Sequence, residues 1–121
     1  MKLTKDSKEI LHSIFYIYFQ MVKVYIVVYM FQYRKESSYE IIGVYTNKEK
    51  AKKVLIHHAE LKIDDELPVV EMTGNEEIDL DTAVEIFDGS DYWQVINDDD
   101  TITILNNSLA FVFQLIEVVL Q

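Results

Sequence analysis

The sequence contains no cysteine, and this excludes disulfides, thiolate metal ligands and cysteine nucleophiles together. It has only one proline and three glycines, too few for a collagen-like, low-complexity or linker-rich chain. No apolar run approaches the ~20 residues of a membrane-spanning helix, because the run over residues 24–31 begins directly after Lys23. A signal peptide is also unexpected, since Asp6 and Glu9 dilute the basic start and no small-residue cleavage site follows. We therefore expect a cytoplasmic protein that makes no membrane contact.

Basic residues are missing from the second half of the chain. All 11 Lys and Arg residues lie within residues 1–62, whereas residues 63–121 hold 15 of the 21 acidic residues and no Lys or Arg. Fourteen of these acids fall within residues 64–100, and the formal net charge of the whole chain is −10. This asymmetry predicts a surface for an electrostatic partner. The plainer interpretation is that acidic loops only keep a tyrosine-rich domain soluble.

The length of 121 residues, half of them hydrophobic, suits a single domain with its own core. We expect one domain over residues 1–121, of the α+β class, with a small, mostly antiparallel sheet, helices packed on one face, and amphipathic helices at both termini. The first of these helices has a wide apolar face over residues 6–20. Because Met21 stands where the rest of the domain could begin, we expect residues 1–20 to form an appended helix.

Alternating residues predict a hairpin followed by a helix in the first half. Residues 22–33 are expected to form a strand that is buried on one side and aromatic on the other, with residues 39–45 as its partner. Thr46 or Asn47 then caps a helix that ends near Lys62. Its expected inward stripe consists of Ala51, Val54, Leu55, His58 and Leu61.

The second half gives weaker patterns. Residues 69–72 could form a short strand, and Asp79 or Asp81 could cap a brief helix through Phe87. Residues 92–96 and 101–105 predict a hairpin around an Asn- and Asp-rich turn. Asn107 or Ser108 is expected to cap a terminal helix that reaches Gln121.

No motif in the sequence predicts an enzyme. The chain lacks a Gly-rich phosphate loop, a nucleophile elbow and a His-x-x-x-His pair. His57 and His58 are adjacent, so on a helix they diverge by about 100° and do not easily chelate one metal. Asp79 and Asp81 begin like an EF-hand loop, but the required later Gly and Glu are absent. We therefore expect no catalytic residue, no bound metal and no cofactor.

The acidic half should repel nucleic acid, but it could imitate nucleic acid. Duplex DNA carries one phosphate per ~1.7 Å of axis, so an edge of roughly 35 Å needs on the order of twenty charges. The acids of residues 64–100 approach that number. This predicts a non-enzymatic binding protein that blocks a basic, nucleic-acid-binding surface of a nuclease or another host-defence protein. The predicted contacts are acidic residues with two aromatic anchors: Asp79, Asp81, Glu85, Asp88, Asp91, Tyr92, Trp93, Asp98, Asp99 and Asp100.

Two alternatives remain open at this point. One is a homo-oligomeric module that sequesters a small ligand, with Tyr25, Tyr29 and Tyr33 lining a pocket and the terminal helices making the subunit contact. The other is a small globular protein with no mimicry role. A run of three aspartates, 98–100, could hold a hard cation, but it suits a hairpin turn better.

Three short segments within residues 23–53 carry a family resemblance: VYIVVY, YEIIGVYT and NKEKAKK. In this order they resemble a widespread kind of small phage and bacterial protein of unknown function, with a strand, an IIGVY-type strand and a helix that starts like KEKA. The motif is structural, because Gly43 lets the strands approach or bend. The resemblance implies no catalytic residue. It implies a mobile-element context, in which short acidic proteins often act as inhibitors of host defence.

Overall fold

Five antiparallel strands form the frame of the structure, a computed structural model that describes residues 7–12 and 22–120. The strands are β1 (Lys23–Tyr33), β2 (Glu36–Tyr45), β3 (Gln94–Asp98), β4 (Thr101–Leu105) and β5 (Leu109–Val119), arranged in the order β2-β1-β5-β4-β3. Between β2 and β3 in the sequence lie the helices α2 (Lys48–Glu66), α3 (Val69–Thr73) and α4 (Leu80–Ile86). The expected α+β fold with a mostly antiparallel sheet is confirmed.

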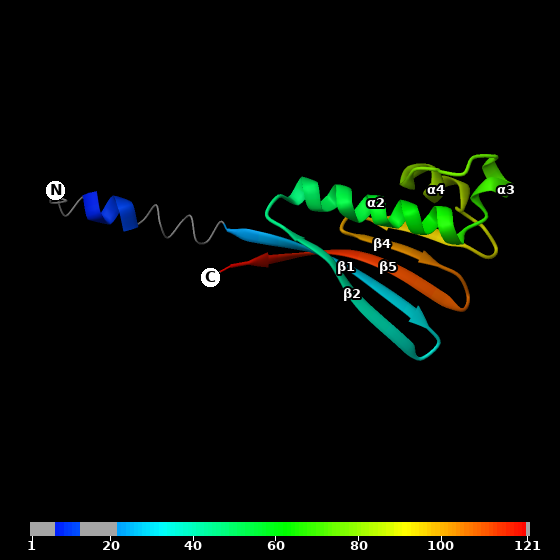
Figure 1. Ribbon diagram of the computed structural model, residues 1–121, viewed down its shortest axis with the longest axis horizontal. Coiled ribbons are helices and arrows are strands. Elements are labelled where there is room, and N and C mark those ends of the chain that lie inside the picture. The colour runs from blue at the N-terminus through cyan, green and yellow to red at the C-terminus, as the bar shows by residue number, and fades with distance from the viewer. Residues whose placement is uncertain (1–6, 13–21, 121) are drawn as a thin grey trace.

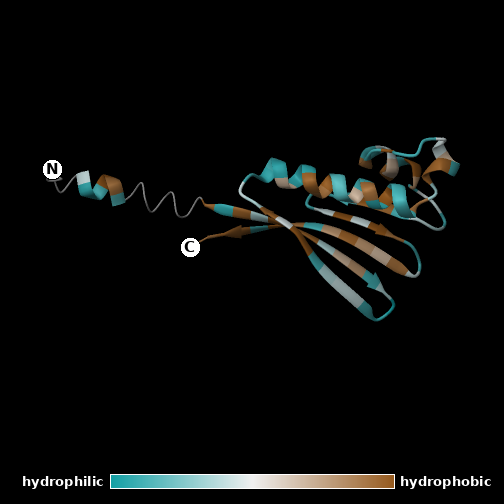
Figure 2. Cartoon of the chain, in the orientation of Figure 1, coloured by the Kyte–Doolittle hydropathy of each residue, from teal (hydrophilic) through white to brown (hydrophobic). Residues whose placement is uncertain are grey.

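These three helices lie on one side of the sheet (Figure 1). The long helix α2 contacts β1, β2, β4 and β5, while α4 contacts α2 and the edge strand β3. The turns of α2 alternate between hydrophilic and hydrophobic residues (Figure 2), as a helix half-sunk in a core requires. The two layers therefore form one core between them, and the other face of the sheet is not covered by any of these helices.

The core combines small residues on α2 with large aromatic rings on the strands. Ala51 and Ala59 are fully buried in the centre of the helix stripe and leave room for rings from the sheet. Tyr29 packs against Phe113 with ring centroids 4.9 Å apart. The aromatic side of β1 is thus the side that packs on the core, and the expectation that it lies opposite the buried side is wrong.

Helix α2 begins as predicted, because the Asn47 side chain accepts a hydrogen bond from the backbone N–H of Lys50 at 2.9 Å. It continues to Glu66 rather than ending near Lys62. The predicted inward stripe is partly wrong: Leu61 is 51% exposed, and the stripe is completed by Ala59 and Ile63. The four-residue spacing of this stripe follows one face of the helix more closely than the predicted set does.

A β-bulge shapes the first hairpin. Val27 pairs with Gly43 and Val28 pairs with Ile41, so Ile42 is an extra residue in β2. A Cβ atom on Gly43 would lie 2.6 Å from the Tyr45 hydroxyl oxygen, so glycine is needed for the Tyr45 ring to lie over the strand. The turn between the strands is shorter than expected, with Arg34 in the left-handed conformation at φ 57°.

The predicted C-terminal helix is wrong, because residues 109–119 form β5, the central strand of the sheet. The predicted cap was Asn107 or Ser108, but the residue before them, Asn106, makes a turn that leads into β5. Its side-chain oxygen accepts the backbone N–H groups of Ser108 and Leu109 at 2.8 and 3.0 Å, which makes a turn instead of a helix cap. Short polar side chains bind neighbouring backbone N–H groups equally well in both settings.

Of the predictions for the remaining elements, some are confirmed and one is wrong. The predicted short strand over residues 69–72 is wrong, because these residues lie in helix α3. The predicted brief helix after Asp79 is confirmed as α4, and the predicted late hairpin is confirmed as β3 and β4. Residues 7–12 are helical, while the rest of the expected appended helix over 1–20 lies outside the described residues. None of the described helices is both long and apolar enough to cross a membrane.

Candidate functional site

The acidic segment occupies one side of the domain, which we call the acidic edge and define as residues 79–100. It consists of α4, the loop over residues 87–93, β3 and the turn that follows β3. Helix α4 contacts α2 on one side and β3 on the other, and β3 is the last strand of the sheet. Because these elements are neighbours in space, the acids of this segment share one margin of the domain. The β1–β2 hairpin lies at the opposite margin.

Helix α4 presents a row of carboxylates because its apolar residues are buried. Leu80, Ala83 and Phe87 are all at least 97% buried. The residues between them, Asp81 and Glu85, are exposed, and Asp88 is exposed directly after the helix. On a helix the spacing of 81 and 85 places both side chains on one face, about 6 Å apart along the axis, and Asp88 follows in the turn after α4.

Asp79 has a structural role at the start of α4. Its side chain accepts a hydrogen bond from the backbone N–H of Thr82 at 2.8 Å, so it is the N-cap of the helix. Hydrogen bonds from Thr82 hold the pKa of the Asp79 carboxyl below its ordinary value of 3.8. Because the pKa is lower in the folded state, this cap contributes fully above pH 3.8 and weakens as the pH falls through the folded value.

The turn between β3 and β4 is partly neutralised. Asp99 has a φ of 53° and forms the tight turn with Asp100, as the aspartate run predicted. The Lys52 ammonium from α2 lies 3.6 Å from the Asp99 carboxylate and 3.5 Å from that of Asp100. A lysine from the first half of the chain therefore neutralises part of the negative charge at the turn between β3 and β4. Asp98, the last residue of β3, remains exposed.

Two carboxylates of α2 hold the acidic segment against the domain. Glu60 accepts the backbone N–H of Leu80 at 2.8 Å, and Asp64 accepts that of Ile78 at 3.1 Å. These bonds fix the residues before α4 on the end of α2. Asp64 was counted among the acids of the predicted surface, but its carboxylate is used inside the domain.

The two predicted aromatic anchors differ in exposure. Tyr92 is 58% exposed, whereas Trp93 is half-buried and stacks on Phe111 with an angle of 14° and a centroid distance of 6.5 Å. Tyr92 lies edge-on to Trp93 at 5.6 Å. Trp93 thus joins the core, and Tyr92 is the aromatic side chain that the acidic edge offers to a partner.

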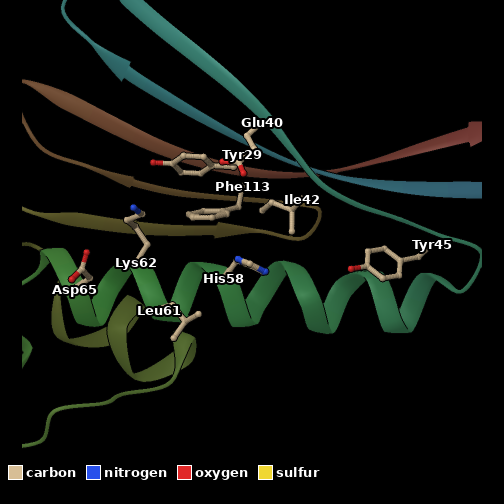
Figure 3. Close-up of a pocket in the computed structure, with 9 residues that line it drawn as sticks. All are labelled: Tyr29, Glu40, Ile42, Tyr45, His58, Leu61, Lys62, Asp65 and Phe113. Carbon is tan, nitrogen blue, oxygen red and sulfur yellow. The ribbon is translucent and has the colours of Figure 1, made fainter.

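A separate groove opens between α2 and the β1–β2 hairpin, with a volume of about 590 Å³. Figure 3 shows Lys62 rising from α2 toward Tyr29 and Phe113, with Glu40 on the strand above. The Lys62 ammonium lies 5.3 Å from the centre of the Tyr29 ring. The groove also contains His58 and Asp65. Of its lining residues the sequence analysis named Tyr29 as part of a pocket, and the full set was not predictable because its residues come from four separate elements.

The predicted tyrosine pocket is not assembled as expected. Tyr29 lines the groove, but the Tyr25 hydroxyl donates to Glu117 at 3.3 Å, and Tyr33 is stacked under Arg34 at the far end of β1. Within residues 7–12 and 22–120, no three His, Asp or Glu side chains are placed to hold a metal ion together.

Comparison with known proteins places part of the chain in a described family. Residues 22–85 match the model of a family described as a domain of unknown function, DUF7336. The match begins directly before β1 and ends within α4, so β3, β4 and β5 lie outside it although they complete the same sheet. No curated protein and no solved structure matches the chain.

Proposed function

We propose that this chain, which belongs to the DUF7336 family of unknown function, is a non-enzymatic binding protein whose acidic edge occupies a basic, nucleic-acid-binding surface of a partner. A nuclease or another host-defence protein is the kind of partner that this charge pattern fits. The observation that carries the proposal is the exposed row formed by Asp81 and Glu85 on one face of α4 and by Asp88 in the turn directly after it.

The acidic edge is negatively charged and has few cations near it, and both features support this function. No Lys or Arg follows Lys62 in the sequence, so the edge contains no cation of its own. Within the described residues, Lys52 is the lysine paired with this edge, and it reaches only the turn after β3. The carboxylates of α4 are therefore free to attract a basic surface and to accelerate its association at low salt.

The spacing of the carboxylates, compared with that of DNA phosphates, indicates how many acidic residues must contact the partner. The row on α4 offers about one carboxylate per 6 Å, whereas duplex DNA has one phosphate per ~1.7 Å of axis. The row alone therefore falls short several-fold, and the exposed Asp91, in the loop that follows α4, must contribute beside it. Tyr92 adds an exposed aromatic ring of the type that anchors interfaces.

A labelled ten-residue polylysine peptide tests this function as a probe of basic surface. We expect the chain to bind the peptide at an ionic strength of about 50 mM, and the dissociation constant to rise about tenfold by 200 mM as salt screens the edge. The measurement is fluorescence anisotropy across a salt series. Absence of binding at low salt, or a dissociation constant that does not change with salt, would overturn the proposal.

A second candidate function is the binding of a small ligand in the groove beside α2. Its volume of about 590 Å³ lies in the range of ligand sites. The Lys62 ammonium already lies over two rings, so the carboxylates of Glu40 and Asp65 remain to pair with a ligand amine. Native mass spectrometry of the purified chain with phenethylamine, a small aromatic amine, distinguishes this function from the first.

A further inference from the structure

We propose that the open face of the sheet is the interface of a symmetric homodimer, in which a second copy packs the same face against it. We define the open face as the strand residues whose side chains point away from α2. It includes Val28 and Met30 of β1, Ile41 of β2, and Val112 and Ile116 of β5, which alternate with core residues such as Val27 and Phe113.

The open face is apolar and nearly free of charge. Ile41 is 65% exposed and Ile116 is 39% exposed, because no described helix covers this face. Charged residues make up 26% of the chain, yet on this face only Asp98 carries a charge, and it lies on the edge strand β3. An apolar patch of this kind on a domain surface marks an interaction site.

The sequence of the two central strands indicates that both faces of the sheet are covered. β1 and β5 read as almost continuous apolar runs, KVYIVVYMFQY and LAFVFQLIEVV, and β5 is brown along most of its length in Figure 2. A sheet with one solvated face normally alternates apolar and polar residues. The helices supply the cover on one face, so a second layer is needed on the other.

The area of the open face favours a second copy of the chain as the layer that covers it. With strands about 4.8 Å apart and about 3.3 Å per residue, the five strands cover roughly 650 Å². A face-to-face pair would then bury about 1,300 Å² in total, which is within the range of specific interfaces. A helix about 10 Å wide and fifteen residues long, as expected over residues 6–20, would cover only about a third of the face.

Gln114 lies where the symmetry axis of such a pair would pass. It is an exposed residue on β5, the middle strand of the order β2-β1-β5-β4-β3, and it pairs with Val28 on one side and Thr101 on the other. In a symmetric interface, residues near the axis meet their own copies. The two Gln114 side-chain amides can donate to and accept from each other, so these amide groups at the centre of the face are satisfied.

Sedimentation of the full chain tests the dimer. We expect the wild-type chain to be a dimer at about 10 μM. Gln114→Lys and Ile116→Lys each place two ammonium groups near the axis, and we expect them to raise the dissociation constant at least about 100-fold. Both positions are exposed in one copy, so circular dichroism should show that the monomers stay folded. Val70→Lys is the matched control, because Val70 is 51% exposed on α3, away from the sheet.

Each outcome decides the proposal. Dimeric wild-type and control chains with monomeric Gln114→Lys and Ile116→Lys chains support it. A monomeric wild-type chain would overturn it, and would leave the N-terminal segment or a different protein as the cover of this face. Variants that dimerise as tightly as the control would also overturn it, because the interface would then lie elsewhere. The polylysine measurement is independent, since α4, which carries Asp81 and Glu85, lies on the other side of the sheet.

Discussion

Replacing Phe87 with alanine is expected to lower the free energy of unfolding by about 3–5 kcal/mol. Phe87 is 1% exposed and is the largest fully buried side chain of the described core. It closes α4, where its backbone N–H donates to the carbonyl of Ala83 at 3.0 Å, and its ring enters the core shared with the sheet. Truncation removes apolar burial and leaves a cavity where α4 is attached to the domain.

Urea unfolding of the Phe87→Ala and wild-type chains measures this loss. Because domains of this size are stable by only about 5–15 kcal/mol, the change should move the midpoint strongly. Val70→Ala is the control, since Val70 is half-exposed and its truncation should change stability by no more than about 0.5 kcal/mol. Equal midpoints for Phe87→Ala and wild type would show that Phe87 is not part of the core.

Replacing both Glu60 and Asp64 with alanine is expected to lower the free energy of unfolding by about 2–4 kcal/mol. Each carboxylate accepts one backbone N–H from the segment that leads into α4, at 2.8 Å for Glu60 and 3.1 Å for Asp64. Hydrogen bonds to charged groups contribute about 1.5–3 kcal/mol each, and because both side chains are only partly buried we expect about 1–2 kcal/mol for each bond here. Without them, Ile78 and Leu80 lose their backbone hydrogen bonds to α2.

Asp65→Ala with Glu66→Ala is the matched control for that pair. It removes the same charge from the same end of α2, where a carboxylate opposes the helix dipole, so stability should stay the same or rise slightly. Hydrogen exchange of the amides of Ile78 and Leu80 gives a local readout, and we expect faster exchange in the Glu60 and Asp64 variant alone. Equal loss of stability in the two double variants would contradict the assigned hydrogen bonds.

Local chemistry made much of the fold predictable. Asn47 and Asp79 sit directly before apolar helical patterns, and both are N-caps in the structure. The aspartate run after β3 predicted a tight turn, which Asp99 forms with a positive φ. These features depend on neighbours within a few residues, and such patterns are visible in a sequence.

Features that depend on distant contacts were not predictable in the same way. Residues 109–119 form an apolar run without a clear period, and only pairing with β1 and β4 makes them a strand. The salt bridges of Lys52 to Asp99 and Asp100 join residues nearly fifty positions apart. The groove beside α2 likewise needs β1, β2, α2 and β5 to be in place before His58 and Lys62 can line it.

The acidic edge is tested most directly by comparing two triple variants that change net charge equally. Asp81→Asn with Glu85→Gln and Asp88→Asn removes the row that begins on α4 and ends directly after it. The control changes three exposed acids elsewhere, in Glu9→Gln with Glu36→Gln and Glu49→Gln.

The measured quantity is the dissociation constant of each triple variant for the labelled polylysine peptide at low salt. We predict that loss of the row raises it about tenfold and that the control changes it by no more than about twofold, because exposed charge pairs contribute about 0.2–1 kcal/mol each only where they meet a partner. An equal change in both variants would contradict a defined acidic binding surface.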